Sequence, residues 1–207
     1  TGGGLDTSDP AIVSITVAAT TRDSAVSLHD GTLRIQGTAE ADTVTVDLNA
    51  AADRLEVTLN DGDKQVFELS RVQTIRVTGD NGDDEITIDA NTEVPAHVFG
   101  GRGNDTINGG NGPDNLQGGR GDDLIDGGGG NDRIFGSRGA DTMDGAAGKD
   151  RLSGGRENDS LDGGANADIV DGGRDDDDLS GSDDNDRLFG RSGDDTVDGG
   201  GDREISV

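Results

Sequence analysis

A nine-residue pattern repeats eleven times without an insertion between Gly100 and Asp198. Its first position is always glycine, its sixth always aspartate and its eighth always aliphatic. The sixth-position aspartates are Asp105, Asp114, Asp123, Asp132, Asp141, Asp150, Asp159, Asp168, Asp177, Asp186 and Asp195. The eighth-position residues are Ile107, Leu116, Ile125, Ile134, Met143, Leu152, Leu161, Val170, Leu179, Leu188 and Val197. This periodicity predicts a repeating turn rich in glycine and carboxylate, followed by a short strand with one inward apolar side chain.

The array resembles the hemolysin-type, or RTX, calcium-binding repeat GGxGxDxUx, in which U is aliphatic. The resemblance covers residues 100 to 198 and reaches back weakly to about residue 79. It implies an all-β fold, a right-handed parallel β-roll or β-helix solenoid in which two nonapeptides make one turn. It also implies calcium between successive loops on each edge, held by the sixth-position carboxylate and the carbonyls of positions one to four.

On this basis we expect about nine to eleven calcium ions. The predicted metal-binding residues are Asp84, Gly101, Gly103, Asp105, Gly110, Gly112, Asp114, Gly119, Gly121, Asp123, Gly128, Gly130, Asp132, Gly139, Asp141, Gly148, Asp150, Asp159, Asp168, Asp177, Asp186 and Asp195. Glycine at positions one, two and four would let the backbone turn its carbonyls inward, in conformations that a Cβ hinders.

The negative charge of the chain also favours binding of a cation in these loops. The formal net charge is −27, with four Phe and no Trp or Tyr, a composition that is normally typical of disordered sequence. Aspartates on neighbouring turns would face one another at about 4.8 Å and repel by roughly 3 kcal/mol per pair at an effective dielectric of about 20. Calcium reverses that sign and accepts six to eight oxygens. Zinc prefers nitrogen or sulfur ligands, of which the chain offers only His29 and His97, and magnesium usually keeps several waters.

Several repeats depart from the glycine pattern. The fourth position holds Glu157, Asn166, Asp175 and Asp184, and the second holds Ser137, Ala146, Ser182 and Arg191. Because a side chain disfavours left-handed backbone angles, most of all at Glu157, we expect weaker or distorted calcium sites there.

Before residue 100 the sequence is β-rich but less regular. Strands are expected at residues 11–17, 32–36, 43–48, 54–60, 65–69 and 74–78, where β-branched residues alternate with polar ones. Two diverged frames, at residues 37–45 and 79–87, place Asp42 and Asp84 at position six. Asp84 and Asp105 would stack if Ile88, Asp89 and Ala90 formed a bulge.

We therefore predict one elongated solenoid with longer N-terminal rungs. Residues 1–78 would form a β-rich cap or β-helix-like region, and residues 79–207 the roll, with regular repeats at 100–198 and a terminal cap at 199–207. A separate β-sandwich for residues 1–99 is the alternative.

No catalytic motif is present. The chain lacks HExxH, GxSxG and cysteine, and Gly148-Lys149 is followed by Asp150 rather than by Ser or Thr, so no enzyme is expected in these residues. So acidic a chain is a poor partner for nucleic acid, and no run of about 18 apolar residues predicts a membrane span. The N-terminus lacks the basic and apolar regions of a secretory signal. The resemblance implies type I secretion to the exterior or the bacterial surface, with folding at extracellular calcium, and we expect a monomer.

The leading hypothesis is a secreted, calcium-binding structural module. The alternative is a polysaccharide- or cell-surface-binding module of adhesin type, or an accessory part of a larger secreted enzyme. Arg102, Arg120, Arg138, Arg156 and Arg174 recur at third positions and would form a ladder for such a polyanion, or compensate the charge of Asp122, Glu157 and Asp175. Ice binding is disfavoured, because the outward positions five and seven are irregular.

Overall fold

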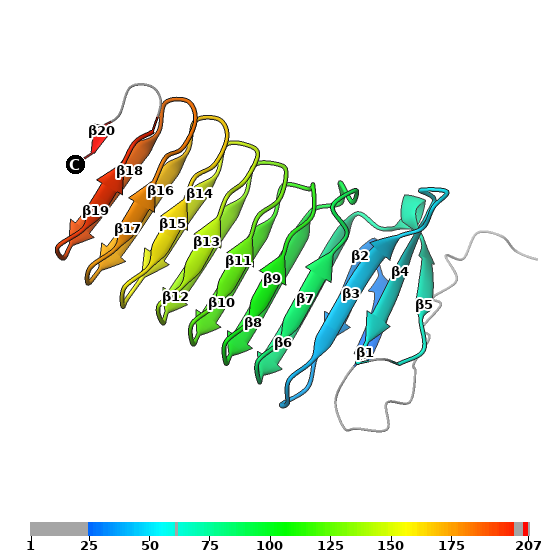
Figure 1. Ribbon diagram of the computed structural model, residues 1–207. Helices are drawn as coiled ribbons and strands as arrows, with labels where there is room; N and C mark the ends of the chain where they lie inside the picture. The colour runs from blue at the N-terminus through cyan, green and yellow to red at the C-terminus, as the bar shows by residue number, and fades with distance from the viewer. Residues whose placement is uncertain (1–24, 61, 201–204, 207) are drawn as a thin grey trace, which may run out of the picture.

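The computed structural model describes residues 25–60, 62–200 and 205–206 as an all-β solenoid. Two ten-stranded sheets, here called sheet A and sheet B, face each other, and the chain contributes a strand to each sheet in every turn (Figure 1). The predicted β-solenoid is therefore confirmed.

Sheet A carries the longer strands. In spatial order they are β1 (Ala25–His29), β2 (Thr32–Gln36), β6 (Thr74–Asn81), β8 (Ala96–Arg102), β10 (Asn115–Arg120), β12 (Arg133–Arg138), β14 (Arg151–Gly155), β16 (Ile169–Arg174), β18 (Arg187–Ser192) and β20 (Ile205–Ser206).

Sheet B is built mostly from three-residue strands. In spatial order they are β19 (Thr196–Asp198), β17 (Asp178–Ser180), β15 (Ser160–Asp162), β13 (Thr142–Asp144), β11 (Leu124–Asp126), β9 (Thr106–Asn108), β7 (Glu85–Ile88), β3 (Thr43–Leu48), β4 (Arg54–Leu59) and β5 (Gln65–Glu68). A 3₁₀ turn, η1 (Leu69–Arg71), follows β5.

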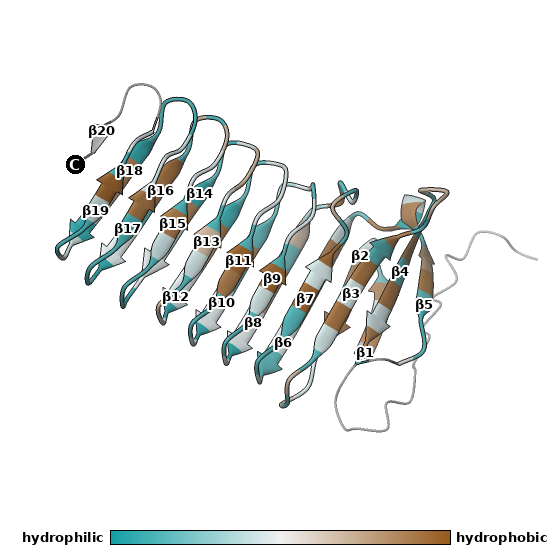
Figure 2. Ribbon diagram, viewed as in Figure 1, coloured by the Kyte–Doolittle hydropathy of each residue, from teal (hydrophilic) through white to brown (hydrophobic). Residues whose placement is uncertain are grey.

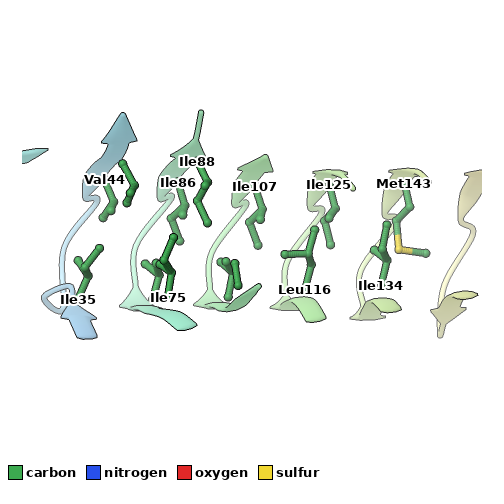
Figure 3. Close-up of a cluster of buried hydrophobic side chains, with 14 of the residues drawn as sticks. Ile35, Val44, Ile75, Ile86, Ile88, Ile107, Leu116, Ile125, Ile134 and Met143 are labelled. Atoms are coloured by element: carbon green, nitrogen blue, oxygen red, sulfur yellow. The ribbon is translucent and has the colours of Figure 1, made fainter. Parts of the chain in front are cut away.

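Within the repeats every strand pairs in parallel with the strand 18 residues further on, for example Leu116 with Ile134 and Ile125 with Met143. This register places the eighth-position side chains of both sheets in one continuous core, where they meet between the sheets (Figure 3). All of them are buried except Val197, which is partly buried. Hydrophobic segments accordingly recur in the middle of successive strands (Figure 2).

The N-terminal strands belong to the same two sheets. Parallel pairing of β2 with β6 and of β6 with β8 carries sheet A through residue 99, so the alternative of a separate sandwich is wrong. Five expected strands are confirmed as β2 to β6, whereas residues 11–17 lie outside the described part of the chain. The antiparallel pairs β1–β2, β3–β4 and β4–β5 close the N-terminal end of the solenoid.

The expected bulge at residues 88–90 and the expected terminal cap have different outcomes. Ile88 is not part of a bulge, because it is buried in β7 and pairs with Val46, and the three extra residues of this turn fall in the connection at residues 89–95. Of the expected terminal cap, Ile205–Ser206 pairs with β18, while residues 201–204 and 207 lie outside the described residues.

Candidate metal centres along the two edges of the roll

Buried aspartates line both edges of the solenoid. The edge where the chain passes from sheet A to sheet B holds Asp42, Asp84, Asp105, Asp123, Asp141, Asp159, Asp177 and Asp195. The opposite edge holds Asp114, Asp132, Asp150, Asp168 and Asp186. All are buried except Asp195, which is partly buried.

A ladder of hydrogen bonds joins the aspartates along each edge. The amide of each aspartate donates to the carboxylate Oδ1 of the aspartate one turn further on, over 2.7 to 3.0 Å. On the first edge the ladder runs unbroken from Asp42 to Asp195, through both diverged frames. On the second edge it starts where the amide of Ala96 donates to Asp114.

The other carboxylate oxygen has no partner. The Oδ2 atoms of eleven aspartates are buried and accept no hydrogen bond: Asp84, Asp105, Asp114, Asp123, Asp132, Asp141, Asp150, Asp159, Asp168, Asp177 and Asp186. An unsatisfied buried polar group costs about 1–3 kcal/mol, and more when it is charged. Repeated eleven times at one position, the missing partner indicates a ligand that binds carboxylate oxygen, and a cation fits.

The first-position glycines make room for these oxygens. A Cβ on Gly100, Gly118 or Gly136 would lie within 3.0 Å of Oδ2 of the aspartate in the same repeat, and equivalent glycines show the same clash. None of the first-position glycines of the array has a left-handed φ. Our expectation that position one needs a special backbone conformation is therefore wrong: the glycine is required by space for the carboxylate.

Positions two and four do need left-handed angles, with Gly112 as an exception. In the described array no hydrogen bond is donated to the fourth-position carbonyl oxygens. The carbonyl oxygen of Gly103 instead lies against the Cα of Gly121 one turn further, where a Cβ would clash. Each loop thus offers a free carbonyl oxygen as well as a free carboxylate oxygen.

This donor set suits calcium. Among the described residues no cluster of three or more His, Cys, Asp or Glu side chains converges, so a metal here would depend on backbone oxygens as well as carboxylates. Calcium accepts that mixture in flexible geometry. His29 contacts Asp30 at 3.0 Å in the N-terminal hairpin, and His97 lies on the outer face of β8, so neither supplies the nitrogen that zinc prefers at the edges.

The substituted loops keep the regular backbone path. Left-handed φ angles between 61° and 92° occur at Ser137, Ala146, Glu157, Asn166, Asp175, Ser182, Asp184 and Arg191. The aspartate ladder beside them is unbroken, with 2.9 Å between Asp141 and Asp159 and again between Asp159 and Asp177. The expected distortion is therefore wrong for the backbone, whereas weaker calcium binding at these loops remains a prediction.

Burial raises the pKa of the ladder carboxyls from Asp84 to Asp168 toward neutrality. The pKa of Asp114 rises to about 8, and that of Asp123 to about 7. The main cause is burial, opposed by the amide hydrogen bond and reinforced by the facing carboxylate. Asp105 and Asp150 reach about 6 for the same main reason. Without a cation, these carboxyls retain protons at a pH where exposed aspartates are ionised.

Asp42 ends the ladder without an unpaired oxygen. Its Oδ2 accepts a hydrogen bond of 2.5 Å from the Thr38 amide, and its Oδ1 accepts from the Asn60 side-chain amide and the Thr38 hydroxyl. Protein donors therefore occupy the place that is empty at the next turns. The repeat pattern could locate Asp42 but not Asn60, which comes from the end of β4, outside any repeat frame.

Comparison with known proteins agrees with this geometry. A family model described as the RTX calcium-binding nonapeptide repeat matches residues 97–114, 108–143, 144–179 and 171–203. These segments cover residues 97–203, more than half of the 207-residue chain. No curated protein matches the chain. Within the part of the chain that the structure describes, no helix has the length and apolarity needed to cross a membrane.

Proposed function

Because this chain belongs to the RTX calcium-binding nonapeptide repeat family, we propose that calcium drives the folding of its repeat array into a rigid structural module. The observation that carries the proposal is the row of eleven buried, unpartnered Oδ2 atoms. Structural metal sites of this kind couple binding to folding, because the ligands converge only in the folded chain.

We take the number of proposed calcium sites from the aspartate ladder. Six pairs of neighbouring aspartates from Asp84 to Asp195 line the first edge, and four from Asp114 to Asp186 line the second. With one ion in each gap, the count falls within the predicted nine to eleven ions. The proposed ligands are the sixth-position Oδ2 atoms and loop carbonyls, above all those of position four.

We also propose that this folding accompanies export. Because the chain has a net charge of −27 and each repeat strand buries only one apolar side chain, its repeat array stays extended where calcium is scarce. It then folds at the millimolar calcium found outside the cell, which suits a secreted or surface protein and type I secretion. The array would act as a monomeric module with a structural rather than a catalytic role.

The test is a calcium titration of the full chain, followed by far-UV circular dichroism and by calorimetry to count ions, with magnesium as the control cation. Asp123 belongs to two gaps, since its Oδ1 accepts from Asp105 and its amide donates to Asp141. Asp123→Asn should therefore lose about two ions. Asp122→Asn is the matched control, because Asp122 is exposed and asparagine keeps its acceptor for the Ala140 amide.

Loss of the same number of ions in both variants would contradict the ligand assignment. A β spectrum that is complete in EDTA and unchanged by calcium would contradict the folding proposal itself.

A second candidate function is binding of a polysaccharide or a cell surface, as in an adhesin-type module or an accessory part of a larger secreted enzyme. The arginine ladder favours it, because Arg102, Arg120, Arg138, Arg156 and Arg174 are exposed. Among the described residues none of the five forms an ion pair, with Asp122, Glu157, Asp175 or any other acid. Retention of the calcium-loaded chain on immobilised acidic polysaccharide would test the role.

A further inference from the structure

Positive charge gathers on the outer face of sheet A, although the chain is strongly acidic. Beside the ladder of third-position arginines, the strand register aligns a second row level with the seventh position of the repeats. It contains Arg34, Arg76, Arg133, Arg151 and Arg187, with His97, Asn115 and Ile169 on the strands between them. All ten arginine side chains are exposed. The seventh and ninth positions of sheet B between β7 and β19 hold no lysine or arginine and include Asp126, Asp144 and Asp162. The two faces of the roll therefore differ in charge.

An aromatic row lies between the two arginine rows. Phe99, Gln117 and Phe135 are neighbours in register on β8, β10 and β12, and each phenylalanine is 40% exposed. A hollow of about 520 Å³ separates Phe99 and Gln117 of this row from Arg102, Arg120 and Arg138, and it is also lined by small residues such as Gly119 and by one carboxylate, that of Asp80. A second hollow of about 230 Å³ shares Phe99 and Gln117 and is lined on its other side by Arg76 and His97. The two hollows lie on either side of Phe99 and Gln117 and are lined by residues of β6 to β12; together we call them the groove.

At the C-terminal end of the same face, the exposed ring and the arginines beside it contact groups of the protein itself. There the guanidinium groups of Arg191 and Arg187 lie 4.7 and 5.3 Å from the centre of the Phe189 ring. Arg191 also pairs with Asp171 at 2.6 Å and is the only arginine of this face in the described residues with an ion pair. Phe99 and Phe135 have no such cover. The face is therefore open over β6 to β12.

We propose that this groove binds a linear polysaccharide of sugar acids, laid along the roll axis. The inference rests on the calcium-folded module proposed above and names its ligand. Guanidinium groups hold carboxylates through paired hydrogen bonds, and exposed aromatic rings pack against the apolar face of a sugar ring. Gln117, Asn115 and His97 add groups that hydrogen-bond hydroxyls.

Spacing favours this polymer over nucleic acid. Arg102, Arg120 and Arg138 lie on successive strands and so recur at about 4.8 Å, which is close to the length of one pyranose ring in an extended chain. Stacked DNA presents a phosphate every 3.4 Å or so along each strand, out of step with the row. The acidic edges adjoining the groove also disfavour so dense a polyanion.

The experiment uses the full chain at a fixed, saturating free calcium concentration. The probes are a β-1,4-linked glucuronic acid hexamer and cellohexaose, which has the same linkage and length but no carboxylate. Calorimetry should detect binding of the glucuronate hexamer and none, or far less, of cellohexaose. The triple variant Arg102→Gln, Arg120→Gln and Arg138→Gln should bind the hexamer at least about tenfold more weakly.

The matched control removes the same charge elsewhere, by Arg54→Gln, Arg71→Gln and Lys149→Gln, and should bind like the original chain. Calcium-induced circular dichroism of each variant separates loss of binding from loss of folding. An original chain that folds with calcium yet binds no glucuronate overturns this inference alone, whereas failure to fold with calcium overturns the proposed function.

Three other results would also overturn the polysaccharide site. Equal weakening by the control triple would show a general charge effect. Stronger arginine-dependent binding to phosphatidylglycerol vesicles would assign the face to a membrane surface. A sedimentation coefficient that reports a dimer, and falls to the monomer value in the Arg102, Arg120 and Arg138 triple, would assign the face to a second copy of the chain.

Discussion

Strands of the N-terminal rungs bury two apolar side chains, such as Leu33 and Ile35 of β2 or Ile75 and Val77 of β6. Strands of the repeats bury one, such as Leu116 of β10, and the adjoining loop buries an aspartate. At the N-terminal end the aspartate ladder stops at Asp42, which protein groups satisfy. Along the array the equivalent oxygens are unpaired.

This difference shows how one fold can be held together in two ways. A buried aliphatic side chain contributes about 1.5–3 kcal/mol, so a strand with two gains roughly twice as much as a strand with one. A buried carboxylate without a partner subtracts from that gain. The N-terminal rungs therefore approach self-sufficiency, while the array depends on a cation, although both share the same sheets.

Removal of calcium should separate the two regions, and this is the largest effect we expect. With EGTA in excess, amides of β10 to β19 should exchange with deuterium rapidly, while those of β2, β3 and β6 stay protected, because these strands bury two apolar side chains each and only the proposed site at Asp84 adjoins them. Hydrogen exchange with mass spectrometry, with and without calcium, measures this directly. Equal loss of protection in both regions would mean that the N-terminal rungs depend on the array for their stability, which would contradict the difference described above.

Acid should partly replace calcium. Nine of the ladder carboxyls, from Asp84 to Asp168, have pKa values raised from 3.8 to about 6–8 in the folded chain, so the folded state binds more protons than the unfolded state between pH 3.8 and these values. The resulting stability is fully present below about pH 3.8 and is lost progressively as the pH rises from there to the folded pKa values of about 6 to 8. In buffer stripped of calcium, circular dichroism should show more β structure at pH 5 than at pH 8. High salt at pH 8 is the control, since it screens repulsion but leaves the cost of burial; a β signal that rises with pH would contradict this account.

A smaller effect should follow from Ala146 and Ala147, which adjoin in one loop. Ala146 holds a φ of 62°, whereas Ala147 has no left-handed angle. Ala146→Gly should stabilise the calcium-loaded chain by about 0.5–1 kcal/mol by removing that strain, and Ala147→Gly should destabilise it by a similar amount through lost backbone entropy. Urea unfolding at saturating calcium measures both variants. The same sign for the two substitutions would show that backbone angle does not limit the array.

The nonapeptide period was sufficient to predict the solenoid, the facing aliphatic rows and the aligned aspartates. It succeeds because one residue type recurs at one spacing, so that stacking of any two turns implies the rest. It also located Asp42 and Asp84, whose frames are diverged. The position of a residue in the repeat frame is therefore enough to identify most of the candidate metal-binding aspartates.

What the period did not predict depends on contacts outside the frame. Asn60, the residue after β4, donates a hydrogen bond to Asp42, and the second arginine row joins Arg34 and Arg76 of irregular rungs to Arg133 and Arg151 of regular ones. Neither the hydrogen bond nor the arginine row can be predicted until the strand register is known. The reason for the first-position glycine was also out of reach, because it lies in the rotamer of a carboxylate five residues away.

The amide-to-carboxylate ladder gives the array a direction. Each aspartate amide donates toward the C-terminal neighbour, and Asp42 is already fixed by Thr38 and Asn60. A turn that docks on this end meets a finished template, and once docked it becomes the template for the next. Because each turn contacts only its neighbours, assembly becomes a zipper that starts at one end, and the unfavourable first step is taken once for the whole array.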